Sequence, residues 1–250
     1  MLREFEGIVL RSRAYGESHK IVTVFTPQLG KMALLAKGAK KPKSRLAAST
    51  EGLTRSMFAV FYRGGGLETL NRADLLEAYP TLKADLLLYA YALYILELVE
   101  RICEERVPIP GLYPDLVYTL SYLAEGREAS VLKVLFGLKM MGVAGYAPEL
   151  SRCVRCGEGG EPLRLLPDDG GGICPRCARI EKEPAHWPEF SPACWQLLHR
   201  LQQIPLAQLG EIRIRQALLQ EMDRWFSTYA THLLGKPLNS QEFLQQIRGW

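Results

Sequence analysis

The chain has 250 residues, of which 48% are hydrophobic and 23% are charged, a profile that excludes a disordered or collagen-like protein. The formal net charge is only +4, but it is unevenly distributed. Residues 1–80 carry 13 Lys and Arg against 7 Asp and Glu, whereas residues 81–250 carry 18 against 20. This concentration of cations at one end predicts a polyanionic partner for the N-terminal third.

The longest apolar run, residues 86–96, is well short of the ~18 to 20 residues that a membrane span needs. Near the N-terminus, Arg3, Glu4 and Glu6 stand where a secretory signal would have an apolar core. We therefore expect a cytoplasmic protein with no membrane contact.

Residues 1–80 contain five short segments with β-branched or aromatic content, separated by Gly, Pro or Ser. The predicted strands are Phe5–Arg13, Lys20–Thr26, Lys31–Ala36, Ser56–Arg63 and Leu67–Ala78. Five strands in about 80 residues suit a small closed barrel such as an OB-fold, because closure removes exposed edges. An SH3-like barrel fits the strand count nearly as well.

After Pro80 the apolar spacing becomes helical, and it predicts one long central helix over residues 81–106. Further helices are expected over residues 113–125 and 129–143. Ser191 and Pro192 predict the N-cap and first position of a helix that reaches about Gln203. The last predicted helices run from Glu211 to Leu234 and from Ser240. The expected fold class is α+β, with an N-terminal five-stranded barrel followed by an all-helical domain.

Four cysteines form two C-x-x-C pairs separated by 17 residues: Cys153, Cys156, Cys174 and Cys177. Two pairs at this separation are typical of a closed tetrahedral zinc site, since each pair wraps one side of the metal. Their segment is rich in Gly and Pro and has too few apolar side chains to fold alone, so metal binding would supply the missing free energy. Four Cys ligands leave no position for a reactive water, and the predicted cofactor is therefore one structural Zn²⁺. Two reactive dithiols are the alternative.

Cys103 and Cys194 are single and lie in predicted apolar helices, so we interpret both as core residues. Four arginines flank the cysteine pairs: Arg152, Arg155, Arg176 and Arg179. Their simplest role is to offset the negative charge of the metal centre, and contact with nucleic acid is the second interpretation.

The segment from Ser18 to Thr50 contains no carboxylate and seven cations. Most of them lie in residues 37–45, between two predicted strands, where Gly38 and Pro42 oppose regular structure. We expect a mobile loop whose cations reach phosphates, with a solvated charge run as the alternative. Aromatic residues in adjoining strands could stack bases, but barrel core is the more usual role for such residues: Phe25, Phe58, Phe61 and Tyr62.

Signatures of the common enzyme classes are absent from the sequence, which has no P-loop, dinucleotide-binding, metalloprotease or nucleophile-elbow motif. The histidines lack metal-ligand or triad spacing and are interpreted as surface or capping residues: His19, His186, His199 and His232. Asp168 and Asp169 adjoin Gly170 and indicate a turn. We therefore expect a binding protein rather than an enzyme.

Three blocks of sequence together resemble the RecO family of bacterial recombination mediators and DNA-repair proteins. The first comprises residues 16–26 (GESHKIVTVFT) and 36–45 (AKGAKKPKSR). The second is residues 136–150 (FGLKMMGVAGYAPEL), running into the first cysteine pair, and the third is residues 232–244 (HLLGKPLNSQEFL). One departure is Ala178, which follows the second cysteine pair where Gly157 follows the first. The two metal-binding turns are therefore expected to differ in how they hydrogen-bond their sulfurs.

The resemblance implies an OB-fold over residues 1–80, a helical domain over 81–149 and 186–250, and a four-cysteine zinc-binding insertion over 150–185. It implies a protein without turnover that binds single- and double-stranded DNA, anneals complementary strands and associates with RecR. It also implies recognition of the acidic C-terminal tail of single-stranded DNA-binding protein (SSB), help in loading RecA onto SSB-coated strands, and a place at the bacterial nucleoid during repair. The basic positions that match the family are the expected DNA contacts: Lys20, Lys31, Lys37, Lys40, Lys41, Lys43 and Arg45.

Two other classes remain as alternatives. A zinc-ribbon transcription or translation factor would bind through the cysteine segment, so its affinity would depend on Arg155 and Arg176. A zinc-dependent nuclease or deaminase would need an open metal position beside a Glu or His, for which Glu181 is only a weak candidate.

Overall fold

The computed structural model describes residues 1–159, 164–180 and 189–248. The chain packs as two compact units: residues 1–124 with the segment from Phe243 onward, and residues 125–242. The first unit is thus discontinuous in sequence. The three-part division implied by the family resemblance remains a prediction, because the two units are defined by packing alone. No helix within the described ranges is both long and apolar enough to cross a membrane.

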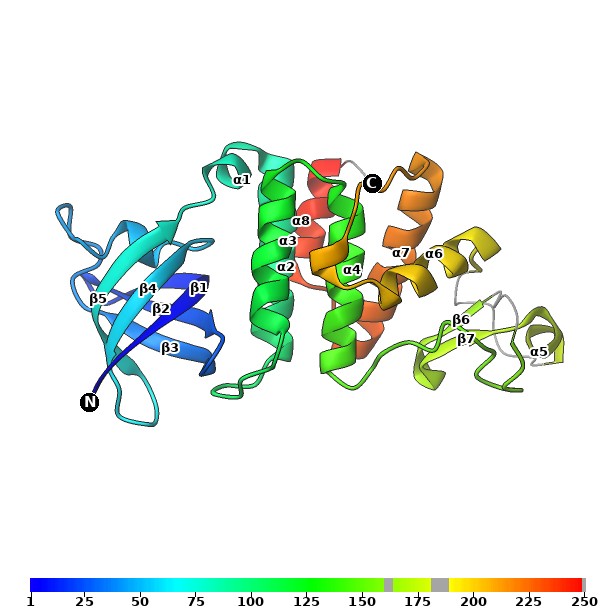
Figure 1. The fold of residues 1–250 in the computed structure, drawn as a ribbon, viewed down its shortest axis with the longest axis horizontal. Coiled ribbons are helices and arrows are strands. Elements are labelled where there is room, and N and C mark those ends of the chain that lie inside the picture. The colour runs from blue at the N-terminus through cyan, green and yellow to red at the C-terminus, as the bar shows by residue number, and fades with distance from the viewer. Residues whose placement is uncertain (160–163, 181–188, 249–250) are drawn as a thin grey trace. The chain divides into compact units, whose positions relative to one another are not determined.

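The N-terminal part of the first unit is a closed five-stranded barrel (Figure 1). The strands follow the order β1–β2–β3–β5–β4, and β4 pairs back onto β1, an arrangement that fits the OB-fold. All pairings are antiparallel except the short one between β3 and β5. The five predicted strands are confirmed: β1 (Leu2–Tyr15), β2 (His19–Thr26), β3 (Gly30–Ala36), β4 (Arg55–Phe61) and β5 (Glu68–Glu77).

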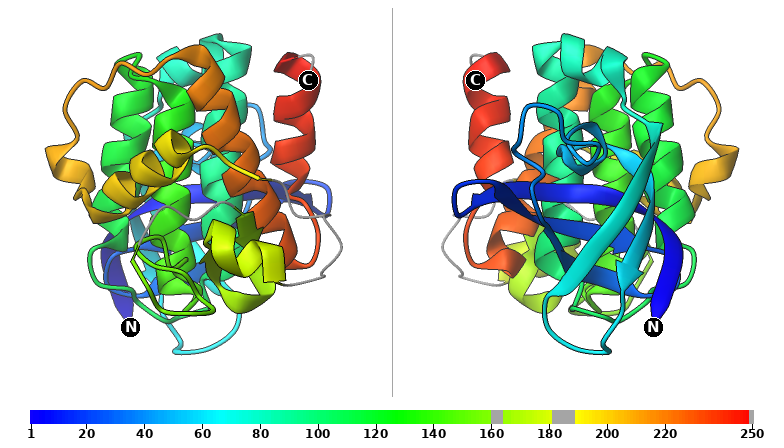
Figure 2. Two further views of the ribbon diagram at one scale, coloured as in Figure 1. Left: turned by 90° about the vertical axis from the view of Figure 1, so that its right-hand side faces the viewer. Right: turned by 90° about the vertical axis from the view of Figure 1, so that its left-hand side faces the viewer.

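The barrel core consists of alternate side chains, as the two-residue period of a strand requires. Phe58 and Val60 are fully buried, whereas Phe61 at the end of the strand turns outward and is 48% exposed. Phe25 is also buried, and the half-buried ring of Tyr62 lies 4.1 Å under the guanidinium of Arg3. Of the four aromatic residues considered for base stacking, Phe25, Phe58 and Tyr62 therefore pack within the barrel unit. The right view of Figure 2 shows the strands of this barrel.

Two helices, one of 5 and one of 17 residues, replace the single helix predicted over residues 81–106, and that prediction is wrong. The chain forms α1 (Pro80–Ala84) and α2 (Leu86–Ile102), and Asp85 between them is extended, with φ −108° and ψ 118°. The Asp85 carboxylate accepts hydrogen bonds from the backbone N–H groups of Leu87 and Leu88, each at 2.9 Å. This cap stabilises the start of α2. The next helix of the first unit is α3 (Leu112–Ala124).

The second unit contains the helices α4 (Ala129–Val143), α6 (Pro192–Gln203) and α7 (Gln216–Leu234), and α6 packs against both others (Figure 1). The predicted cap of α6 is confirmed, because the Ser191 hydroxyl accepts a hydrogen bond from the Cys194 N–H at 3.2 Å. The last helix, α8 (Asn239–Arg248), begins in this unit and ends in the first.

The helix α7 begins at Gln216, five residues later than the predicted start at Glu211. Residues 210–215 form no regular helix or strand. Ile212 and Ile214 are both half-buried while their neighbours are exposed, and this two-residue spacing suits an extended segment rather than a helix. The predicted end of the helix is confirmed by Gly235, whose φ of 73° is the left-handed conformation of a helix terminus.

The helices α4 and α7 approach closely because Gly137 has no side chain. A Cβ atom at Gly137 would overlap the ring of Phe226, which is fully buried on α7. We expect Gly137→Ala to destabilise the protein by about 1 to 3 kcal/mol, since overpacking forces buried side chains to move. The measurement is the urea midpoint of unfolding.

Gly142 is a matched control for this prediction, because it lies in the same helix with no heavy atom within 4 Å of its position for a Cβ. Gly142→Ala is expected to be neutral or to stabilise by up to about 1 kcal/mol, the difference in helix propensity. Equal destabilisation by the two variants would contradict the close approach as the cause.

Candidate metal centre and nucleic-acid interface

The four predicted metal ligands lie together in the second unit. Cys153 and Cys156 belong to one turn, while Cys174 follows the hairpin of β6 (Arg164–Leu166) and β7 (Gly171–Ile173) and Cys177 lies in α5 (Pro175–Ile180). All four Sγ atoms are within 4.8 Å of one another. The Sγ atoms of Cys156 and Cys174 are 3.9 Å apart. A tetrahedral site with Zn–S bonds of about 2.3 Å has an S–S edge of about 3.8 Å, so the cluster fits zinc.

The two metal-binding turns share their backbone hydrogen bonds despite the difference between Gly157 and Ala178. The Gly157 N–H donates to the Cys153 carbonyl at 2.9 Å, and the Ala178 N–H donates to the Cys174 carbonyl at 2.9 Å. Gly157 has a φ of 72°, which favours glycine, whereas Ala178 lies within helix α5. Ala178 therefore leaves this bond to the carbonyl intact, and the expected difference in hydrogen bonds to the sulfurs remains a prediction.

The protonation of the cluster favours a bound cation. Burial opposes ionisation of Cys153, but N–H donors from residues 156, 174 and 155 outweigh it and lower its pKa to about 6. Desolvation and the three neighbouring sulfurs raise the pKa of Cys177 to about 12. The four sulfurs cannot all ionise while no cation is bound, because neighbouring thiolates repel each other. A divalent metal would offset that repulsion and hold all four as thiolates.

The arginines beside the cysteines are largely engaged in ion pairs. Arg155 contacts Asp169 at 2.8 Å and Arg176 contacts Glu158 at 3.3 Å. Arg152 contacts Glu149 at 3.0 Å. Arg152 and Arg176 keep more than 60% of their side-chain surface exposed in these pairs. Cys103 and Cys194 are both buried, as predicted, and burial raises the pKa of Cys103 to about 11.

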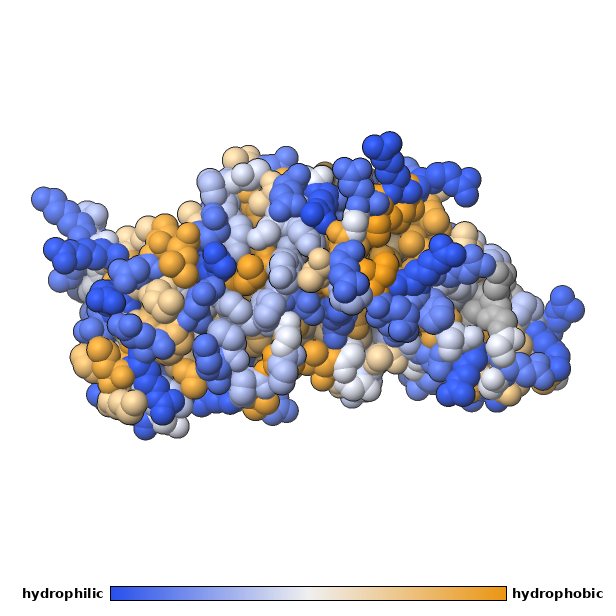
Figure 3. All heavy atoms as spheres, in the orientation of Figure 1, coloured by the Kyte–Doolittle hydropathy of each residue, from blue (hydrophilic) through white to orange (hydrophobic). Residues whose placement is uncertain are grey.

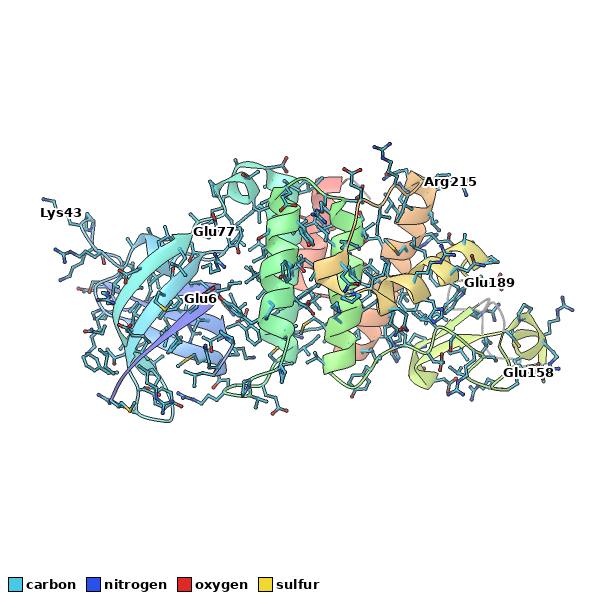
Figure 4. All side chains as sticks on the ribbon, viewed as in Figure 1. Glu6, Lys43, Glu77, Glu158, Glu189 and Arg215 are labelled. Carbon is cyan, nitrogen blue, oxygen red and sulfur yellow. The ribbon has the colours of Figure 1, made fainter. Side chains whose placement is uncertain are left out.

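The cations predicted to bind DNA divide into two groups. Five lie in residues 37–45, here called the basic loop: Lys37, Lys40, Lys41, Lys43 and Arg45. All five are exposed, and within the described residues none of them has a carboxylate partner. Figure 4 shows Lys43 projecting away from the barrel, and Figure 3 shows hydrophilic atoms projecting there. These five side chains are available to phosphates.

The other two residues predicted to contact DNA, Lys20 and Lys31, bind partners within the first unit. The Lys20 ammonium contacts the Glu51 carboxylate at 2.6 Å, and the Lys31 ammonium donates to the Glu100 carbonyl at 2.5 Å. Lys20 is 14% exposed. Both residues therefore have structural partners, and their role as DNA contacts remains a prediction.

The basic loop is built from successive turns rather than from irregular chain. The Lys41 N–H donates to the Gly38 carbonyl and the Ser44 N–H donates to the Lys41 carbonyl. The Gly38 N–H also donates to Nδ1 of His19 at 2.9 Å, which makes His19 the capping residue that the sequence suggested. The loop is thus tied at its first residues to the β1–β2 turn, and its mobility beyond them remains a prediction.

Two residues outside the predicted sites contact each other in the second unit. His232 on α7 contacts Asp168 at 2.8 Å, in the turn between β6 and β7. This pair has no metal-ligand arrangement. Glu181 and His186, considered for an open metal position or a capping role, lie outside the described residues.

Sequence reasoning missed a groove in the first unit that has a volume of about 480 Å³. It is lined by Arg11 and Arg13 of β1, by Lys20 and Lys40, and by Tyr89 of α2 among others. The alternation of two arginines on one strand was the available signal, because residues i and i+2 share a face. The contribution of α2 depends on packing and had no signal in the sequence.

The chain is similar over almost its whole length to known proteins. It matches the family model described as recombination protein O N terminal over residues 1–79, and the model described as recombination protein O C terminal over residues 83–242. It is 36% identical over 247 residues to the DNA repair protein RecO of Bacillus subtilis, covering 99% of this chain and 95% of the relative. It is 34% identical over 249 residues to the DNA repair protein RecO of Listeria monocytogenes, covering 100% of this chain and 96% of the relative. The chain therefore belongs to the RecO family.

Proposed function

We propose that this protein is a recombination mediator in DNA repair that binds single- and double-stranded DNA through its barrel and anneals complementary strands. The observation that carries the proposal is the basic loop, in which five exposed cations have no carboxylate partner among the described residues. The loop lies on a barrel of the OB type, an architecture that binds oligonucleotides. Membership of a family whose curated relatives are named DNA repair proteins supports the same role.

Annealing requires no catalytic turnover in this mechanism. Two complementary strands repel each other through their phosphates, and a surface that places cations along both strands lowers that repulsion. Contacts to phosphates carry no sequence information, so cations that bind only the strand backbones make the activity independent of sequence. The four-cysteine cluster would hold one structural Zn²⁺, which stabilises its segment and takes no part in strand pairing.

The proposal extends to the partners expected from the family. The protein would associate with RecR, recognise the acidic C-terminal tail of SSB, and help RecA load onto SSB-coated single strands. A cytoplasmic location at the nucleoid is part of the same proposal.

The test is annealing of complementary oligonucleotides, bare and SSB-coated, at several salt concentrations and without added nucleotide. We expect salt-sensitive annealing of both substrates with no strand cleavage, because the driving contacts are ionic. Absence of annealing by folded, zinc-loaded protein would overturn the proposal and favour a zinc-ribbon factor instead. Addition of RecR and RecA to the SSB-coated substrate then tests the loading step.

A further inference from the structure

The groove in the first unit brings together cations and an apolar wall. Its lining includes residues 10–14 of β1 together with Tyr89 and Leu93 of α2. Lys40 of the basic loop and Glu51 also line it. A volume of about 480 Å³ lies within the range of about 300 to 1,000 Å³ that is usual for ligand sites.

The strand β1 and the start of the basic loop bring the cations of this groove together. Arg11 and Arg13 are both exposed and point to the same face of β1, since they are two residues apart. The Lys40 N–H donates to the Ser18 carbonyl at 3.0 Å, which fixes the start of the basic loop beside the β1–β2 turn. Arg11 reaches Glu100 at 3.5 Å while its side chain stays 60% exposed, and Arg13 has no ion-pair partner among the described residues. The groove therefore presents positive charge to solvent.

The part of the lining that comes from α2 supplies an aromatic ring. Tyr89 and Leu93 are four residues apart on α2 and so share one face of the helix, and both are half-buried. Sites for single-stranded nucleic acid combine a cationic groove for the backbone with aromatic side chains on which bases stack. Tyr89 is the only aromatic residue among the described residues that line this groove.

One carboxylate lies among the groove residues. Glu51 contacts Lys20 at 2.6 Å, and its side chain is 57% exposed whereas that of Lys20 is 14% exposed. A carboxylate on an ammonium group occupies the position that a phosphate oxygen would take. A strand that enters the groove must displace Glu51 to reach Lys20.

We propose that this groove binds a short stretch of single-stranded DNA, with phosphates on Arg11, Arg13 and Lys40. One base stacks on Tyr89, and Glu51 acts as an internal competitor for Lys20. This inference rests on the proposed DNA-binding function and adds a defined path for the strand. It also explains why a residue predicted to contact DNA has a carboxylate partner.

The stacking contact is tested with the variant Tyr89→Leu. For the variant and for the wild-type protein, the affinity for an oligo(dT) strand is compared with the affinity for an abasic strand of equal length. Wild-type protein is expected to prefer oligo(dT), and Tyr89→Leu should reduce that preference about tenfold, a value typical of one stacked base. Affinity for the abasic strand should stay unchanged. Tyr118→Leu is the matched control, because Tyr118 is a 41% exposed tyrosine in the same unit that does not line the groove.

The competitor role is tested with Glu51→Gln. Release of Lys20 should raise affinity for oligo(dT) several-fold and steepen the slope of log K against log salt by about 0.7, the contribution of one added phosphate contact. Glu104→Gln is the control, since it removes one exposed carboxylate of the same unit outside the groove. Melting temperature and zinc content of each variant confirm that it is folded.

Different outcomes separate this inference from the proposed function. If wild-type protein binds DNA salt-sensitively but each groove variant behaves like its control, the groove is refuted and the proposed function stands. If wild-type protein binds neither strand, the proposed function fails as well. If Glu51→Gln strengthens binding of a polyglutamate peptide while its affinity for oligo(dT) matches that of Glu104→Gln, the groove binds an acidic peptide and this inference is overturned.

Discussion

Replacement of Lys40, Lys41 and Lys43 by alanine is expected to flatten the salt dependence of single-stranded DNA binding by about 2 in the slope of log K against log salt. Each phosphate contact to a single strand contributes about −0.7, so the five cations of the basic loop give about −3.5 and the remaining two about −1.4. Over a tenfold range of salt concentration, this difference corresponds to about a hundredfold in affinity. The measurement is fluorescence anisotropy of a labelled oligonucleotide at four or more salt concentrations, together with the annealing rate.

The control for this triple variant removes three exposed cations of the second unit: Arg213, Arg215 and Lys236. Both variants change the net charge equally, so a general loss of positive charge would weaken binding in both. We expect the control to keep the wild-type slope. An unchanged slope in the Lys40/Lys41/Lys43 variant would refute the role of the basic loop.

Removal of the metal should unfold the cysteine segment and spare the barrel. Structural zinc contributes about 10 to 16 kcal/mol in small zinc peptides, far more than the three-residue strands β6 and β7 and their small apolar cluster can replace. Cys153→Ala is therefore expected to lower the zinc content from one ion to none and to abolish hydrogen-exchange protection in residues 150–159 and 164–180. DNA affinity and its salt slope should stay at wild-type values, because the basic loop lies in the other unit.

Cys194→Ala provides the control for loss of a thiol, since Cys194 is buried in α6 of the same unit and is not part of the cluster. It should retain one zinc ion. Retention of zinc by Cys153→Ala would show that the metal is held elsewhere. A fall in DNA affinity of folded, metal-free protein would place the cysteine segment in contact with DNA.

The sequence predicted those elements that have local signals. Gly- and Pro-containing turns divided the barrel into its five strands, and Ser191–Pro192 marked the start of α6. The four cysteines were found because both pairs carry their spacing in the sequence. The break at Asp85 was missed because helical periodicity continues across it. A helix-start residue five positions after Pro80 was the signal that could have revealed two helices.

Contacts between distant residues had no such signal. Lys133 on α4 is 1% exposed and donates to Asp223 at 2.7 Å and to Ser227 at 3.1 Å, both on α7. These residues are about ninety positions apart, and Lys133 alone would be placed on the surface. The groove beside Tyr89 is similar, because its two walls belong to a strand and a helix that are brought together only by packing.

The discontinuity of the first unit has a consequence for synthesis of the chain. Domains generally fold as they emerge from the ribosome, N-terminal part first. Residues 1–124 emerge early, but the segment from Phe243 that belongs to the same unit is made only after the whole second unit. The first unit therefore cannot complete its packing until the residues of α8 from Phe243 onward have been synthesised. A stop codon before Phe243 would damage the unit that was translated first.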